Sequence, residues 1–138
     1  MSSLKRKSAR KTSVILNMFW QEEHCMMVEK VFDDLYKRYE DFNWSIVSQT
    51  DRTFVGELKR EIGKNHFFYH QQIQAVAKCD SNDDVLFLVT GDNEKKDDYY
   101  IFHLTYSGHG EENLKYKRFD GIESVKAYIE KVYIEEYL

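Results

Sequence analysis

The 138-residue sequence is poor in cysteine, contains no proline and has no long apolar run. Its two cysteines, Cys25 and Cys79, do not make a disulfide framework, so we expect a protein of the reducing cytoplasm. No apolar stretch approaches the ~20 residues that a membrane-spanning helix needs. The basic N-terminus leads only into the short apolar segment 14–16, which does not fit a secretory signal.

Acidic residues are also missing from the start of the chain, where none precedes Glu22. Residues 1–12 hold five of the twenty basic residues and predict a flexible basic tail ahead of a single domain over residues 13–138. The rest of the chain has 15 basic and 24 acidic residues, a net charge of −9. Such an acidic body disfavours nucleic acid as the main partner, apart from the basic tail, and favours a basic protein.

The most apolar and aromatic part of the sequence, residues 72–106, predicts three consecutive β-strands. They cover residues 73–79, 85–89 and 99–106, and the two connectors between them are rich in turn formers and charges. Connectors of this length suit hairpins and leave no room for a crossover helix, so the strands should be antiparallel. Short strands over residues 44–47 and 116–119 would extend this meander.

Three amphipathic segments predict helices, because their apolar residues recur at intervals of three and four. The expected helices cover residues 13 or 17 to 39, residues 50 or 51 to 62, and residues 121 to about 137. Gly63 follows the second of them as a left-handed cap. The fold class is therefore α+β: an antiparallel sheet of three to five strands packed by N-terminal, central and C-terminal helices, which we expect on one face.

A candidate binding surface follows from the two faces of the strand over residues 99–106. Alternate residues from Tyr100 onward are apolar or aromatic and should face the core, whereas the opposite face is mixed. The predicted surface combines His66, Tyr99, His103 and His109, the last from the loop 107–113 that follows the strand. The alternative is that a helix covers this face and that His103 is a hydrogen-bonded core residue.

Two histidines four residues apart, His66 and His70, suggest a metal site as an alternative function. Two ligands do not make a site, so a third would have to come from elsewhere in the chain. The candidates are Glu57, Glu61, Cys79 and His103. Glu57 and Glu61 also share a helix face one turn apart, where exposed carboxylates are a commoner interpretation than an acid–base pair.

Two short patterns carry a resemblance to a group of small uncharacterised bacterial proteins. Residues 83–87 read Asp-Asp-Val-Leu-Phe, and residues 103–108 read His-Leu-Thr-Tyr-Ser-Gly; Phe54 to Leu58 and His66 resemble the same pattern upstream. The likeness covers roughly residues 44–120, with Tyr106 in place of a tryptophan and without the group's prolines. It implies a single α+β domain from a bacterium and brings no established activity.

Composition and size favour a binding function over an enzymatic one. Aromatic residues make up 15% of the chain, and ten of them are tyrosines, which supply contact area together with a hydroxyl group. No residue spacing supports a catalytic triad. We therefore expect a non-enzymatic protein-binding domain without a cofactor, of the immunity type that caps a basic toxin or effector; the alternative is a metal-dependent enzyme or sensor that uses His66 and His70.

Overall fold

A computed structural model describes residues 26–89, 98–106 and 114–138 and confirms the α+β fold class. Five strands form one antiparallel sheet whose spatial order, β1-β2-β3-β4-β5, follows the chain. The predicted basic tail, Cys25, the start of the first helix and the loop that holds His109 lie outside the described residues. The strands are Trp44–Ile46 (β1), Ile73–Cys79 (β2), Asp84–Val89 (β3), Asp98–His103 (β4) and Tyr116–Phe119 (β5).

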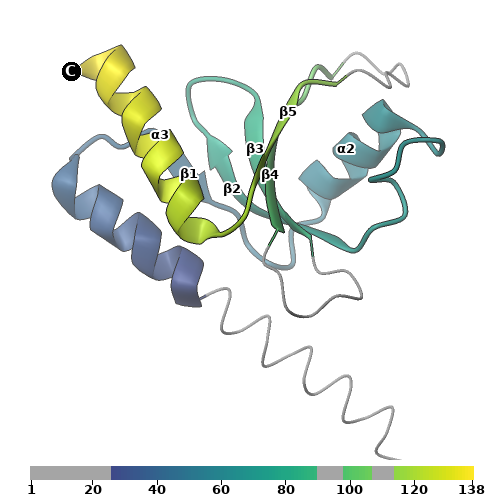
Figure 1. Cartoon of the computed structure of the whole chain (residues 1–138), viewed down its shortest axis with the longest axis horizontal. Coiled ribbons are helices and arrows are strands. Elements are labelled where there is room, and N and C mark those ends of the chain that lie inside the picture. The colour runs from purple at the N-terminus through teal and green to yellow at the C-terminus, as the bar shows by residue number, and fades with distance from the viewer. Residues whose placement is uncertain (1–25, 90–97, 107–113) are drawn as a thin grey trace, which may run out of the picture.

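Three helices pack on this sheet: an N-terminal helix described over residues 26–38, α2 (Thr53–Ile62) and α3 (Ile122–Tyr137). Our expectation that they share one face is wrong, because they cover both faces (Figure 1). The N-terminal helix and α3 pack with Leu86 and Leu88 on one face, and α2 packs with Phe87 on the other. Both faces of β3 are therefore buried, as its continuous apolar sequence requires.

Each face has its own apolar core. On the face of the N-terminal helix and α3, Phe32, Leu35 and Val125 are fully buried. On the α2 face, Leu58 and Phe102 are fully buried. Burying one such side chain stabilises the fold by roughly 1.5–3 kcal/mol.

A bulge in β2 changes which face its residues point to. Ile73 and Ala75 lie in the α2 core, whereas Val76, Ala77 and Cys79 lie in the core beneath α3. The register against β3 shifts between Ala75 and Ala77, so the extra residue reverses the alternation. This lets β1 pair with the second half of β2 and bury Trp44 on the α3 side.

Candidate functional site

A hollow lies at the β5 edge of the sheet, on the face that α3 covers. Its volume is about 330 Å³. Its walls come from the starts of β3 and β5, the end of β4 and the middle of α3. We call it the edge hollow; its lining residues are Asp84, Ile101, His103, Lys115, Tyr116, Lys117 and Tyr128.

Sheet register places the polar groups of the edge hollow in a row. Asp84 pairs with His103 across β3 and β4, and the His103 N–H donates to the Lys115 carbonyl oxygen at 3.0 Å. The His103 ring nitrogen Nδ1 lies 2.8 Å from Asp84 Oδ1. Because a carboxylate only accepts, Nδ1 carries the proton, and Nε2 is the acceptor of the neutral ring and a second donor when the ring is protonated. The imidazole is half exposed, so a ligand can contact the ring.

Lysine and tyrosine side chains form the other wall of the edge hollow. Lys117 Nζ lies 4.4 Å from the centre of the Tyr128 ring, a cation–π contact. Burial, followed by the nearby Asp84 charge, raises the pKa of the Tyr128 hydroxyl, which therefore stays protonated as a donor. Lys115 and Lys117 are exposed and lie on the same side of the sheet, so the hollow is locally basic on an acidic protein.

The chemistry of the edge hollow suits binding of a carboxylate or another anion. Two lysines, His103 and Tyr128 line it, and one carboxylate, that of Asp84, orients the imidazole. The seven lining residues include no serine, threonine or cysteine, so this histidine–aspartate pair has no hydroxyl or thiol nucleophile within the hollow. The arrangement therefore favours recognition over covalent catalysis.

On the opposite face of the same edge lies a cluster of aromatic rings. Phe67 stacks on His66, with ring centroids 4.7 Å apart, and contacts Tyr116 at 6.1 Å. Phe67 is 55% exposed and Tyr116 is 47% exposed, although both are large apolar rings. We call His66, Phe67 and Tyr116 the aromatic platform. Exposed aromatic side chains beside an edge strand are typical of interfaces.

The structure separates the residues of the predicted binding surface. His103 borders the edge hollow, but Tyr99 is fully buried beneath the helices of the same face. His66 lies on the α2 side, where it contacts Phe102, and it is only 9% exposed. His109 lies outside the described residues. His66 and His103 are therefore not brought together, and sequence reasoning missed the lysines and Tyr128 beside His103.

His66 and His70 also stay apart from any third metal ligand that the structure describes. The Phe68 N–H donates to His66 Nδ1 at 3.1 Å, which uses one ring nitrogen in a structural contact. His70 is exposed, outside the buried surroundings of His66. Across residues 26–89, 98–106 and 114–138, no three histidine, cysteine or carboxylate side chains gather closely enough to hold a metal.

Glu61, which the sequence suggested as an exposed carboxylate, is fully buried at the end of α2. Its Oε1 accepts the Thr105 N–H and hydroxyl, each at 2.7 Å, and its Oε2 accepts the Tyr106 N–H at 3.0 Å. Tyr106 has a φ of 56°, in the left-handed region that non-glycine residues rarely adopt. Glu61 thus fixes the chain where it leaves β4.

The Glu57 and Glu61 carboxyl groups titrate as a pair with opposite shifts. The hydrogen bond to Glu61, followed by burial, raises the pKa of Glu57. Burial acts to raise the pKa of Glu61, but hydrogen bonds from Glu57, Thr105 and Tyr106 outweigh it and lower that pKa. Of the two carboxyl groups, Glu61 therefore ionises at the lower pH and Glu57 keeps its proton to a higher pH, although the Arg60 guanidinium, 2.5 Å from Glu57 Oε1, favours the ionised form of Glu57. Both carboxylate oxygens of Glu61 already accept hydrogen bonds from Thr105 and Tyr106. We therefore interpret the pair as a structural clamp.

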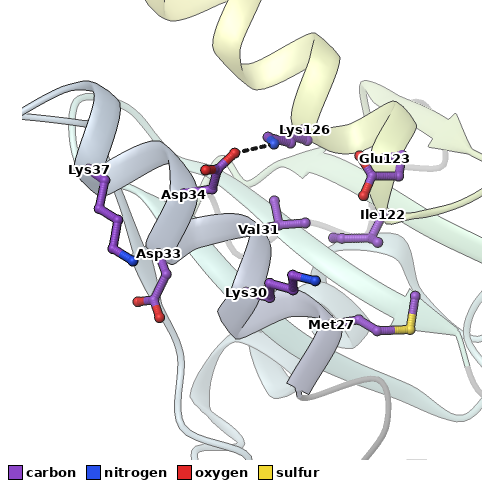
Figure 2. A pocket seen from close by; sticks show the side chains of 9 residues that line it. All are labelled: Met27, Lys30, Val31, Asp33, Asp34, Lys37, Ile122, Glu123 and Lys126. Carbon is purple, nitrogen blue, oxygen red and sulfur yellow. Dashed lines mark hydrogen bonds and ion pairs between the residues drawn. The ribbon is translucent and has the colours of Figure 1, made fainter.

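A second hollow, of about 490 Å³, lies between the N-terminal helix and α3 (Figure 2). Its floor is apolar, formed by Met27, Val31 and Ile122. An ion pair between Asp34 and Lys126 links the two helices across it, and the other rim charges alternate in sign. Because acidic and basic side chains both surround this hollow, it favours neither an anion nor a cation, in contrast to the edge hollow.

Comparison of the chain with protein-family models, with curated proteins and with solved structures finds no match. The resemblance to small bacterial proteins therefore stays a prediction. No helix within the described residues is both long and apolar enough to cross a bilayer.

Proposed function

We propose that this chain is a non-catalytic protein-binding module whose partner lies along the β5 side of the sheet. One observation carries the proposal: within the described residues β5 is the last strand of the sheet, and its open side runs between the edge hollow and the aromatic platform. A strand edge with unpaired peptide groups is a ready template for another chain.

Side chains on both faces of β5 support the proposal. Lys115 and Lys117 line the edge hollow on one face and offer charged donors to a carboxylate. Tyr116 and Phe67 offer a half-exposed aromatic surface on the other face. Tyrosine and other aromatic residues, flanked by polar groups, supply much of the binding energy in protein interfaces.

A second candidate follows from the net charge of −9 over residues 13–138. It is an immunity-type protein that caps a basic toxin or effector. Glu40 and Asp41 are exposed in the turn after the N-terminal helix, and the Asp80 N–H donates to the Asn43 carbonyl oxygen at 2.7 Å, which joins that turn to the one after β2. We call Glu40, Asp41 and Asp80 the acidic corner. It would attract a basic surface, and salt would slow that association.

Charge reversal separates the two candidates. A photocrosslinking residue in place of Lys117 or Asp41 identifies partners at each surface, and calorimetry then measures the affinity of each purified partner. A β5 partner should bind at least tenfold more weakly to the Lys115→Glu, Lys117→Glu protein. The same partner should bind equally well to the Lys30→Glu, Lys37→Glu protein, which carries the same charge change on the N-terminal helix.

The immunity candidate predicts the opposite pattern. A basic toxin should lose affinity for the Glu40→Lys, Asp41→Lys protein and keep its affinity for the Lys115→Glu, Lys117→Glu protein. A partner whose affinity is unchanged by all three double substitutions contradicts both candidates. Circular dichroism of each variant verifies that these exposed substitutions leave the fold intact.

A further inference from the structure

The backbone pattern of β5 shows which of its peptide groups face outward. The His103 N–H donates to the Lys115 carbonyl oxygen, and the register continues with Phe102 opposite Tyr116 and Ile101 opposite Lys117. In an antiparallel ladder, every second residue turns its peptide groups to the neighbouring strand. Lys115 and Lys117 therefore bond inward to β4. The N–H and C=O groups of Tyr116 and Arg118 point away from the sheet.

The side chains of β5 alternate in the opposite sense, between the two faces. Lys117 lies on the α3 side, over the Tyr128 ring, and Lys115 shares its direction in the alternation. Tyr116 lies on the α2 side against Phe102 and the aromatic platform. A strand placed beside β5 would thus meet ammonium groups at every second residue on one face and an aromatic surface on the other.

Resting on the binding function proposed above, we infer that the occupant of the β5 edge is an extended acidic segment of a partner protein, added as a sixth strand. Its backbone bonds to Tyr116 and Arg118. Acidic residues stand opposite Lys115 and Lys117, and an apolar residue between them packs on the aromatic platform. Opposite-charge pairs across neighbouring strands are stabilising, which sets this pattern of acidic, apolar and acidic residues.

Charge argues against a second copy of this chain as the occupant. An antiparallel pair of β5 strands would bring Lys117 of one copy close to Lys117 of the other, whereas Arg118 is already paired with Asp98 and Asp120. Like charges directly opposite one another destabilise a strand pair. Lysine at an edge is a common protection against such self-pairing. An acidic strand meets the same residues with attraction.

A peptide probe tests the inference directly. The probe is an acetylated, amidated peptide of sequence Thr-Glu-Val-Glu-Val-Thr, compared with the block sequence Thr-Glu-Glu-Val-Val-Thr and with an N-methylated form of the first peptide that cannot pair along one edge. NMR titration with the full chain gives each dissociation constant. Hydrogen exchange reads the amides of β5 one by one.

We expect the alternating peptide to bind at least tenfold more tightly than the block and N-methylated peptides. On binding, the Tyr116 and Arg118 amides should exchange at least tenfold more slowly. The Lys117 amide, already bonded to β4, should change little. The Lys115→Glu, Lys117→Glu protein should bind the alternating peptide at least tenfold more weakly, and the Lys30→Glu, Lys37→Glu protein should bind it as the unchanged chain does.

Four outcomes overturn the inference. Equal binding of the N-methylated peptide, or no binding of the alternating peptide, excludes strand addition; the protein-binding function still stands if a partner crosslinked at Lys117 loses affinity on charge reversal. Sedimentation that shows a dimer with Tyr116 and Arg118 amides already protected assigns the edge to a second copy. A crosslinked partner whose affinity does not change on charge reversal contradicts the proposed function as well.

Discussion

The two edges of the sheet avoid unwanted pairing in different ways. At β1, the Tyr36 hydroxyl donates to the Trp44 carbonyl oxygen at 2.6 Å, and the Ser45 hydroxyl donates to Asp80 at 2.8 Å. Side chains thus occupy part of a strand that is only three residues long. At β5, the outward peptide groups have charged neighbours, Lys117 and Arg118, in place of such caps.

The difference matters for function because only one kind of protection is selective. A hydroxyl bonded to a strand carbonyl blocks any incoming chain. A row of basic side chains repels another basic edge and attracts an acidic one. The acidic corner lies beside β1, and the two lysines of the edge hollow lie at β5, so these two groups of exposed charges are at opposite edges of the sheet. We expect a partner to bind at the charged β5 edge, whereas the hydroxyl cap at β1 contributes to the stability of the fold.

The largest effect should come from removing the clamp that fixes the chain on its way to β5. Glu61→Ala loses three hydrogen bonds to a charged acceptor, which should lower the free energy of unfolding by about 2–3 kcal/mol. Urea denaturation measures this change. Glu57→Gln places an amide donor beside Glu61 and loses only the exposed ion pair with Arg60, so it should cost less than half as much. Equal losses in the two variants would contradict a clamp centred on Glu61.

The pH dependence of stability should identify the same carboxylate. Because the folded pKa of Glu61 is lowered, its contribution is complete above the ordinary value of about 4.3 and is lost as the pH falls through the folded pKa. Glu57, with a raised folded pKa, contributes below its ordinary value, and that contribution is lost as the pH rises through its folded pKa.

Glu61→Gln should therefore flatten the acid side of the stability curve. Urea midpoints between about pH 2 and pH 7 measure the curve, since this range brackets ordinary carboxyl titration. The variant should also reduce the rise in stability that Glu57 gives on acidification, because the bond to Glu61 is the main cause of its raised pKa. Parallel curves for the variant and the unchanged chain would contradict this assignment.

Opening the β1 edge should have a smaller effect. Tyr36→Phe removes the hydroxyl that caps the Trp44 carbonyl and should lower the free energy of unfolding by about 1 kcal/mol. The Trp44 region should then exchange its amide hydrogens faster. Tyr137→Phe changes an exposed tyrosine at the end of α3 and is the matched control. A stability loss equal to that of the control would show that the cap does not protect this edge.

Removing charge from the β5 edge should change stability least and self-association most. Lys117→Thr with Arg118→Thr removes the cation–π contacts of Lys117 and the exposed ion pairs of Arg118 with Asp98 and Asp120. Each cation–π contact is worth about 0.5–1 kcal/mol at an exposed site, exposed ion pairs contribute little, and the preference of threonine for strands offsets part of the loss. The neutral edge no longer repels its own copy, so sedimentation velocity should show association that rises with concentration. A variant that stays monomeric at high concentration would show that charge is not the protection at β5.

The sequence predicts most of the fold because its local patterns agree with the final structure. The alternation and turn residues around β2, β3 and β4 identify the meander, and the stripe that contains Leu58 and Ile62 identifies α2. Local patterns fail at Val76, where the bulge shifts the alternation by one residue. Nothing in the strand sequence marks that position, because both neighbours are apolar alanines.

The candidate site depends more on tertiary contacts than the fold does. Lys117 and Tyr128 meet because α3 returns across β5, which no spacing within either segment indicates. His66 falls on the face opposite His103, since the turn before β2 sets its side. The sequence did contain one signal for the burial of Glu61. This residue lies three positions after Leu58, on the buried face of α2, where a carboxylate needs hydrogen-bond partners.

The order of the strands has a consequence for how fast the protein folds. Each of β2, β3 and β4 pairs with its neighbour in the chain, so the first contacts of the sheet close short loops. Folding rates rise as contacting residues come closer in sequence. The N-terminal helix and α3 lie far apart in the sequence and contact each other through the ion pairs of Asp34 with Lys126 and Arg38 with Glu130. We expect the central hairpins to form first and this long-range contact to close last.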